Sequence, residues 1–152
     1  MAAQRHKFRF FGSSTKLTPL AQLVMSEDVA GLDAELGKSW QLNEPFSYCT
    51  HCDGLALELA LVESRYKVID YLLAKGADLN VPNAPAMTSA VHTLDTALLD
   101  RLLAAGADLM ATNTVGYNAL TQSVAWKYGE LIPYLEARGL SFSNNIEALQ
   151  SA

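Results

Sequence analysis

Two cysteines carry the clearest chemical potential in this chain of 152 residues. Cys49 and Cys52 stand in the run Cys-Thr-His-Cys, and cysteines with two residues between them have the spacing of zinc ligands. A structural zinc site normally takes four ligands, whereas the sequence has no second cysteine or histidine pair: His6, His51 and His92 fall in unrelated segments. We expect a loop with two thiols and no bound metal, and a metal- or redox-sensing loop is the alternative.

The sequence has none of the common catalytic motifs. The sequence contains no phosphate-binding loop, dinucleotide-binding fingerprint or nucleophile elbow. Its adjacent carboxylates Glu27 and Asp28 fall near a predicted helix turn, which makes them solvated charges. We therefore expect a protein that is not an enzyme, with no catalytic residues and no cofactor.

The charge balance bears on the class of partner. The net charge is −5 and the isoelectric point about 5.1, which disfavours a binder of nucleic acid that neutralises phosphates. A basic protein is the natural electrostatic complement. No run of about 18 apolar residues could span a membrane, and no apolar core of signal-peptide length follows the N-terminus. We expect a cytoplasmic protein, most simply a monomer.

An internal repeat organises the chain. The run Leu-Leu-Ala-Lys-Gly-Ala-Asp-Leu at 72–79 returns as Leu-Leu-Ala-Ala-Gly-Ala-Asp-Leu at 102–109, and a weaker copy occupies 135–142. The glycines of these runs are Gly76, Gly106 and Gly139. Each stands where a strongly apolar helix would end and the chain would need a left-handed residue.

A second landmark lies upstream of each run and keeps the same phase. In one copy, Leu57, Ala60 and Leu61 have the spacing of one helix face, with a small side chain that lets neighbouring helices approach. A short polar stretch with proline, such as 80–85, follows the glycine and predicts a turn. Each unit is therefore predicted to be a helical hairpin.

Two segments resemble the ankyrin repeat. Thr18-Pro19-Leu20 is similar to the opening of that repeat, and the run at 102–108 is similar to its ending. The resemblance covers roughly 17–144 and implies an all-α solenoid of stacked helix-turn-helix hairpins with short finger turns. It implies four units, the first and last divergent, at about 17–47, 48–82, 83–112 and 113–144. Residues 1–16 are then an N-terminal arm or cap, and 145–152 a C-terminal cap or partial fifth unit.

Departures from the repeat carry structural expectations. Pro133 falls inside the second helix of the last unit, which should be kinked or should start late. The first unit ends in Trp-Gln-Leu-Asn at 40–43 in place of the glycine-centred ending.

A concave groove is the binding surface that the resemblance implies, lined by finger turns and by the ends of the first helices. Carried over to this chain, the groove residues are Met25, His51, Glu63, His92, Thr93, Thr114, Tyr117 and Trp126. Tyr117 and Trp126 are the expected anchors, because large aromatics dominate binding energy at interfaces. The alternative for Trp126 is a cap on the core of the last unit. We expect His92 to be a solvated surface histidine rather than a pH-sensitive contact.

The N-terminal arm alternates basic and aromatic residues at 5–11. Such a segment covers the exposed end of the first hairpin with its phenylalanines, or clasps a partner. The leading functional hypothesis is a protein-binding module, such as an adaptor, a small inhibitor or an immunity-type protein that blocks a basic enzyme. Part of a longer ankyrin protein is a second version.

Overall fold

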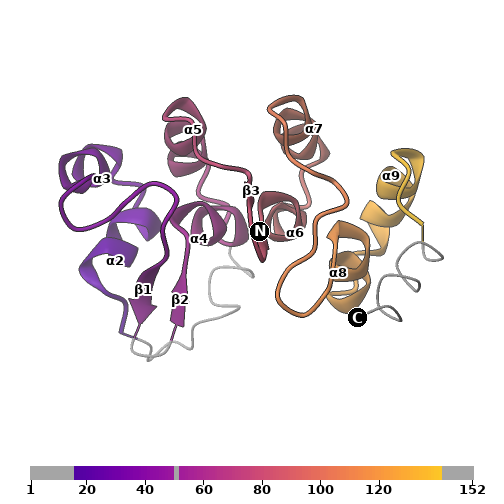
Figure 1. The fold of residues 1–152 in the computed structure, drawn as a ribbon, viewed down its shortest axis with the longest axis horizontal. Helices are drawn as coiled ribbons and strands as arrows, with labels where there is room; N and C mark the ends of the chain where they lie inside the picture. The colour runs from indigo at the N-terminus through magenta and orange to yellow at the C-terminus, as the bar shows by residue number, and fades with distance from the viewer. Residues whose placement is uncertain (1–15, 50–51, 142–152) are drawn as a thin grey trace. The chain divides into compact units, whose positions relative to one another are not determined.

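The computed structural model describes residues 16–49 and 52–141, and this part of the chain is mostly helical with two small antiparallel sheets (Figure 1). The described residues form two compact units, the first ending at Asp78 and the second beginning at Leu79. The predicted arm up to residue 15, His51 and the predicted segment 145–152 lie outside the described residues.

The first unit contains two helical hairpins and one strand pair. Its elements are α2 (Pro19–Met25), α3 (Val29–Glu35), β1 (Phe46–Cys49), β2 (Cys52–Gly54), α4 (Ala56–Val62) and α5 (Tyr66–Ala74). Helix α2 packs against α3 and α4, and α3 packs against α5. Fully buried side chains on the facing sides of these helices, including Val24, Leu32, Leu61, Ile69 and Leu72, form the core.

The second unit has the same plan. Its elements are β3 (Asn80–Val81), β4 (Ala84–Pro85), α6 (Ala86–Ala90), the 3₁₀ turn η1 (Val91–Thr93), α7 (Thr96–Ala104), α8 (Ala119–Ala125), the 3₁₀ turn η2 (Gly129–Leu131) and α9 (Ile132–Ala137). Helix α6 packs against α7 and α8, and α8 packs against α9. None of the helices in the described part of the chain is long and apolar enough to cross a membrane.

The ends of the helices follow from local side-chain chemistry. Thr18, Asp28, Asp95 and Asn118 each precede a helix and accept a hydrogen bond from a backbone N–H of its first turn. The three predicted left-handed glycines are confirmed, with φ of 82° at Gly76 and 102° at Gly106 and Gly139. The first unit also has a left-handed glycine, Gly37, with φ of 83°. The sequence pattern, which places the end of this unit at 40–43, does not predict it.

Strands occupy two of the finger positions where only turns are predicted. In β1 and β2, Phe46 pairs with Gly54 and Cys49 with Cys52; in β3 and β4, Asn80 pairs with Pro85. The all-α expectation is therefore too simple. Phenylalanine and tyrosine in β1 favour extended backbone, and the connection between α3 and α4 is long enough to hold a pair of strands.

The start of α4 is fixed by the side chains of Tyr48 in β1 and of Glu58 in α4 itself. The buried hydroxyl of Tyr48 donates a hydrogen bond to the carbonyl of Leu55, and the N–H of Leu55 donates to Oε1 of Glu58 at 2.9 Å. Burial raises the pKa of Tyr48 well above its ordinary value and also raises the pKa of Glu58. Gly54 passes directly over this arrangement.

The last helix starts late, as the position of Pro133 predicts. Helix α9 begins at Ile132, with Pro133 in its first turn, where no intrahelical N–H is needed. The turn η2 occupies the preceding residues.

Candidate binding surface

Trp126 and His92 meet at one end of the second unit. Trp126 directly follows α8 and is 36% exposed, whereas His92, in η1, is only 1% exposed. The two rings stand edge to face with centroids 5.2 Å apart. The ring of Tyr128 also stands edge to face with His92, with centroids 5.6 Å apart. The expectation of a solvated His92 is therefore wrong, because these aromatic side chains enclose the imidazole.

A chain of hydrogen bonds fixes the buried imidazole. Nε2 of Gln122 lies 3.2 Å from Nε2 of His92, and Nδ1 of His92 lies 2.9 Å from the hydroxyl of Tyr128. Oε1 of Gln122 accepts from Nδ2 of Asn113 at 3.4 Å, so the amide nitrogen of Gln122 is its donor end. Nε2 of His92 must then accept, which places the proton of a neutral imidazole on Nδ1, where it is donated to Tyr128.

The finger loop before α8 is tied to the same chain. Oδ1 of Asn113 accepts hydrogen bonds from the backbone N–H of Val115 and of Tyr117, both at 3.1 Å, and its own N–H donates to the carbonyl of Tyr117 at 2.9 Å. Thr114 is exposed on this loop and Tyr117 is half-buried. Asn113 therefore connects the finger loop, through Gln122 and His92, to the turn that carries Trp126.

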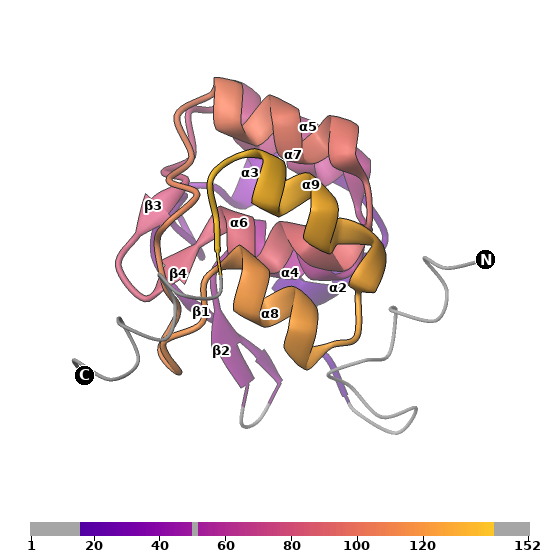
Figure 2. The same ribbon diagram turned by 90° about the vertical axis from the view of Figure 1, so that its right-hand side faces the viewer.

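The two predicted anchors lie at opposite ends of one helix. Tyr117 precedes α8 and Trp126 follows it, and the seven residues of this helix span roughly 10 Å. Figure 2 shows the finger loop entering α8 at one end and the chain leaving it toward α9 at the other. A partner that contacts both aromatic residues must therefore lie along the length of α8.

Thr93 holds the turn beside His92. Its hydroxyl donates to the carbonyl of Ala90 at 2.7 Å and accepts from the N–H of Asp95 at 3.2 Å. Leu94, which lies between Thr93 and Asp95 in the chain, has φ of 55°. Thr93 is half-buried. Its hydroxyl therefore stabilises the connection between η1 and α7.

The predicted groove residues of the first unit are placed less favourably. Met25, at the end of α2, is half-buried, and Glu63 is only 1% exposed. Glu63 ends the last turn of α4, with its N–H donated to the carbonyl of Leu59 at 3.0 Å, and the chain then reverses at Ser64, whose φ is 57°. Because the side chain of Glu63 is buried, its placement on an open groove is wrong.

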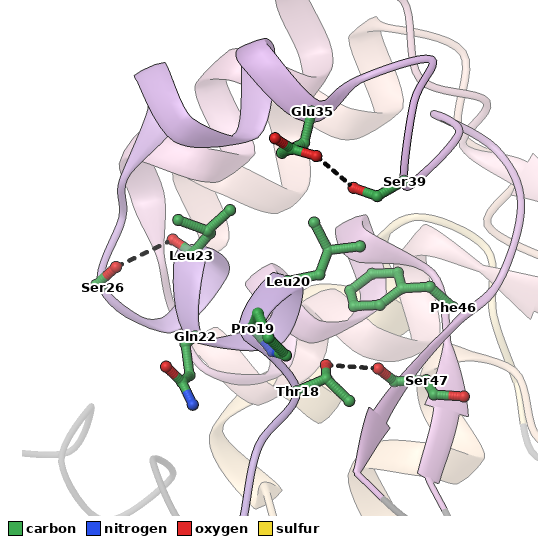
Figure 3. Close-up of a pocket in the computed structure, with 10 residues that line it drawn as sticks. All are labelled: Thr18, Pro19, Leu20, Gln22, Leu23, Ser26, Glu35, Ser39, Phe46 and Ser47. Carbon is green, nitrogen blue, oxygen red and sulfur yellow. Dashed lines mark hydrogen bonds between the residues drawn. The ribbon is translucent and has the colours of Figure 1, made fainter.

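A cavity in the first unit was not predicted. It has a volume of about 820 Å³ and lies among α2, the segment after α3 and β1 (Figure 3). Pro19, Leu20, Leu23 and Phe46 form its apolar lining. The pattern of Thr18-Pro19-Leu20 marks the start of a hairpin but carries no signal for this cavity, which depends on β1 lying alongside α2.

Cys49 is disulfide-bonded and nearly buried. Its backbone pairs with that of Cys52 across the ladder. The expectation of two thiols is therefore wrong for Cys49, and a disulfide sulfur is not the thiolate that binds zinc. Among residues 16–49 and 52–141, no cluster of three His, Cys, Asp or Glu side chains has the arrangement of a metal site.

Each unit also carries an aspartate that joins its two outer helices. Asp33 accepts from the hydroxyl of Tyr71 at 2.8 Å and lies 3.2 Å from the ammonium of Lys75. These hydrogen bonds, that of Tyr71 first, lower the pKa of Asp33, while burial and Asp33 raise the pKa of Tyr71 to about 12.

The second unit repeats this arrangement. Asp100 accepts from the hydroxyl of Tyr134 at 2.5 Å and from Arg138 at 2.8 Å, and the guanidinium lies 3.6 Å from the ring of Tyr134. The hydrogen bond from Tyr134 lowers the pKa of Asp100. We call these two arrangements, Asp33 with Tyr71 and Lys75 and Asp100 with Tyr134 and Arg138, the aspartate clamps. Their carboxylates are exposed and they join helices, so they stabilise the hairpins rather than form a reactive site.

A comparison with protein-family models gave no match, and none of the curated proteins compared with the chain is similar to it.

Proposed function

We propose that this chain is a non-catalytic protein-interaction module of the ankyrin-repeat type, which binds another protein along α8. The binding surface consists of Thr114 and Tyr117 on the finger loop and of Trp126 beyond the other end of the helix. The repeated hairpins and their left-handed glycines support the family assignment.

The packing of Trp126 is the observation on which the proposal depends. Its ring is partly exposed and stands edge to face on a histidine held by Tyr128 and Gln122. An aromatic side chain held in this way loses little conformational entropy on binding, and such anchors contribute about 2 kcal/mol or more at interfaces. A hydrogen-bond network, which extends from Asn113 through Gln122 and His92 to Tyr128, connects both ends of α8.

The partner that we propose is a basic protein. The net charge of −5 gives a chain that attracts cationic surfaces, and attraction of this kind raises association rates at low salt. A small inhibitor or immunity-type protein that blocks a basic enzyme is one concrete form of the proposal. An association rate that does not fall as ionic strength rises would argue against a basic partner.

Affinity capture with matched variants tests the surface. Trp126→Ala should lose the protein that the wild-type chain retains, and Tyr117→Ala should weaken its retention. Tyr66→Ala is the control, because Tyr66 is 39% exposed, much like Trp126, and begins α5 in the first unit. Retention of the same protein by all variants, each shown by circular dichroism to be folded, would remove the assignment of the surface to α8.

A redox-sensing role for Cys49 and Cys52 is the second candidate. The disulfide at Cys49 favours the redox form of this hypothesis over the metal form. Thiol titration of the full chain in glutathione buffers tests it: a change between no free thiol and two within the cytosolic range of potentials supports a sensor. A disulfide that stays closed throughout this range contradicts one.

A further inference from the structure

The cavity of the first unit has an apolar floor and one carboxylate at its edge. Leu20, Leu23 and Phe46 face it from α2 and β1, and Glu35, which accepts from the hydroxyl of Ser39 at 2.9 Å, lies on its far side (Figure 3). Helix α2 buries Ala21 and Val24, while Leu20 and Leu23 are only half-buried. An exposed apolar surface of this kind marks a contact with another segment or molecule.

The segment that precedes α2 has the matching composition. Residues 1–15 hold three of the eleven basic residues of the chain and none of its sixteen acidic residues, and three of its five phenylalanines. Basic and aromatic residues alternate in 5–11, so in extended backbone Phe8 and Phe10 lie on one side and Lys7 and Arg9 on the other. One side thus suits an apolar floor, and the long basic side chains can reach a carboxylate at its edge.

The connection between this segment and the cavity is short. Thr18 and Pro19 line the cavity, and the N–H of Thr18 donates to the carbonyl of Tyr48 at 2.8 Å, which fixes the start of α2 on β1. Residues 12–15 span up to about 13 Å when extended, and Gly12 allows the chain to reverse. The basic-aromatic segment therefore begins within reach of the surface that it matches.

We propose that residues 5–11 of the chain bind in this cavity, with Phe8 and Phe10 against Leu20, Leu23 and Phe46 and a basic side chain beside Glu35. The segment is then an intramolecular cap of the first hairpin. A backbone held in this way cannot enter the active site of a protease.

Limited trypsin digestion of the full chain tests the cap. Cleavage after Arg5, Lys7 and Arg9, followed by mass spectrometry and divided by the rate in a free peptide of residues 1–16, should be at least ten times slower in the wild type than in Leu20→Ser. A variant with Phe8, Phe10 and Phe11 all changed to serine, divided by the rate in its own peptide, should also lose protection. Leu103→Ser, at a half-buried leucine of α7, is the control and should keep the wild-type rate.

Equal normalised rates in all four proteins would overturn the proposal. Protection that increases between about 1 and 100 µM protein would also overturn it, because a second copy would then supply the segment. If Leu20→Ser is unfolded by circular dichroism, the phenylalanine variant decides the matter, since it leaves the cavity unchanged.

Discussion

The imidazole of His92 and the hydroxyl of Tyr128, 36 residues apart in sequence, are joined by a hydrogen bond of 2.9 Å in the interior of the second unit. The spacing is close to one repeat, so the two residues belong to successive hairpins. This polar pair thus joins two successive hairpins, in addition to the hydrogen bonds that Asp100 accepts from Tyr134 and Arg138. The other nitrogen of the ring continues the connection to Gln122.

Replacing His92 should destabilise the second unit. His92→Phe keeps the ring between Trp126 and Tyr128 but leaves the amide of Gln122 and the hydroxyl of Tyr128 without their acceptor and donor. We expect the free energy of unfolding in urea to fall by about 1–3 kcal/mol, and by about 1 kcal/mol for Tyr128→Phe, which removes one hydrogen bond. A change below about 0.5 kcal/mol in His92→Phe would show that the network does not contribute to stability. Nitrogen chemical shifts of the wild-type ring should identify Nδ1 as the protonated atom.

Replacing Asn80 should also destabilise the second unit. Its Oδ1 accepts from the N–H of Asp108 at 2.7 Å and its Nδ2 donates to the carbonyl of Gly106 at 2.9 Å. Asn80→Ala loses both bonds, and we expect a loss of about 1–2 kcal/mol in urea denaturation. Asn80→Asp keeps the acceptor and should lose less. Asn43 makes the equivalent bond to the N–H of Asp78 at 2.8 Å in the first unit, so Asn43→Ala should lose about 1 kcal/mol.

Gly54 should tolerate no side chain. A Cβ atom there would lie 2.6 Å from the hydroxyl of Tyr48 and 3.1 Å from Oε1 of Glu58, and Tyr48 is held by its bond to Leu55. Overpacking of this kind costs about 1–3 kcal/mol, which thermal and urea unfolding of Gly54→Ala should show. Gly129→Ala is the control, because a Cβ at Gly129 meets no atom within 4 Å, and we expect a change within about 0.5 kcal/mol. A Gly54→Ala protein as stable as this control would contradict the packing.

The two aspartate clamps should give stability a defined dependence on pH. The folded state lowers the pKa of Asp33 and of Asp100, so their contribution is present above the ordinary value near 4 and is lost as the pH falls through the folded values. The double variant Asp33→Asn and Asp100→Asn should therefore lose less stability than the wild type between about pH 5 and 3, measured as the shift of the urea midpoint. Parallel acid limbs in the two proteins would contradict the clamps.

The same clamps act at alkaline pH with the opposite sign. Tyr71 has a pKa raised to about 12, so its contribution is present below the ordinary value near 10 and is lost as the pH rises toward 12. In Tyr71→Phe this alkaline loss should be smaller, while the neutral-pH midpoint shifts only slightly. An unchanged alkaline limb in this variant would assign the loss to other groups.

The sequence predicts the features that depend on neighbours in the chain and fails for those that depend on distant partners. Gly76 and Pro133 act through the backbone conformation that they allow, and both were placed correctly. The burial of His92 depends on Tyr128 and Trp126, which lie one repeat further on, and the repeat pattern identifies that spacing without showing that polar atoms pair there.

The candidate site was predicted in part for the same reason. Thr114 and Trp126 are exposed at the positions where the repeat places a finger and a helix end. Glu63 is 1% exposed although it stands, like the exposed Trp126, directly before a residue with positive φ, so the position in the repeat does not determine burial. The strands of the first finger result from pairing between Phe46 and Gly54, eight residues apart, which no helical periodicity indicates.

The positions of the two tryptophans give the chain one optical reporter for each unit. Trp40 belongs to the first unit, is 3% exposed, and donates from Nε1 to the carbonyl of Leu32 at 2.9 Å, whereas Trp126 belongs to the second and is 36% exposed. Since the chain has only these two, emission from Trp40 should be blue-shifted and shielded from acrylamide, and that from Trp126 red-shifted and quenched. Fluorescence alone can therefore tell whether the two halves of the molecule melt together or in sequence.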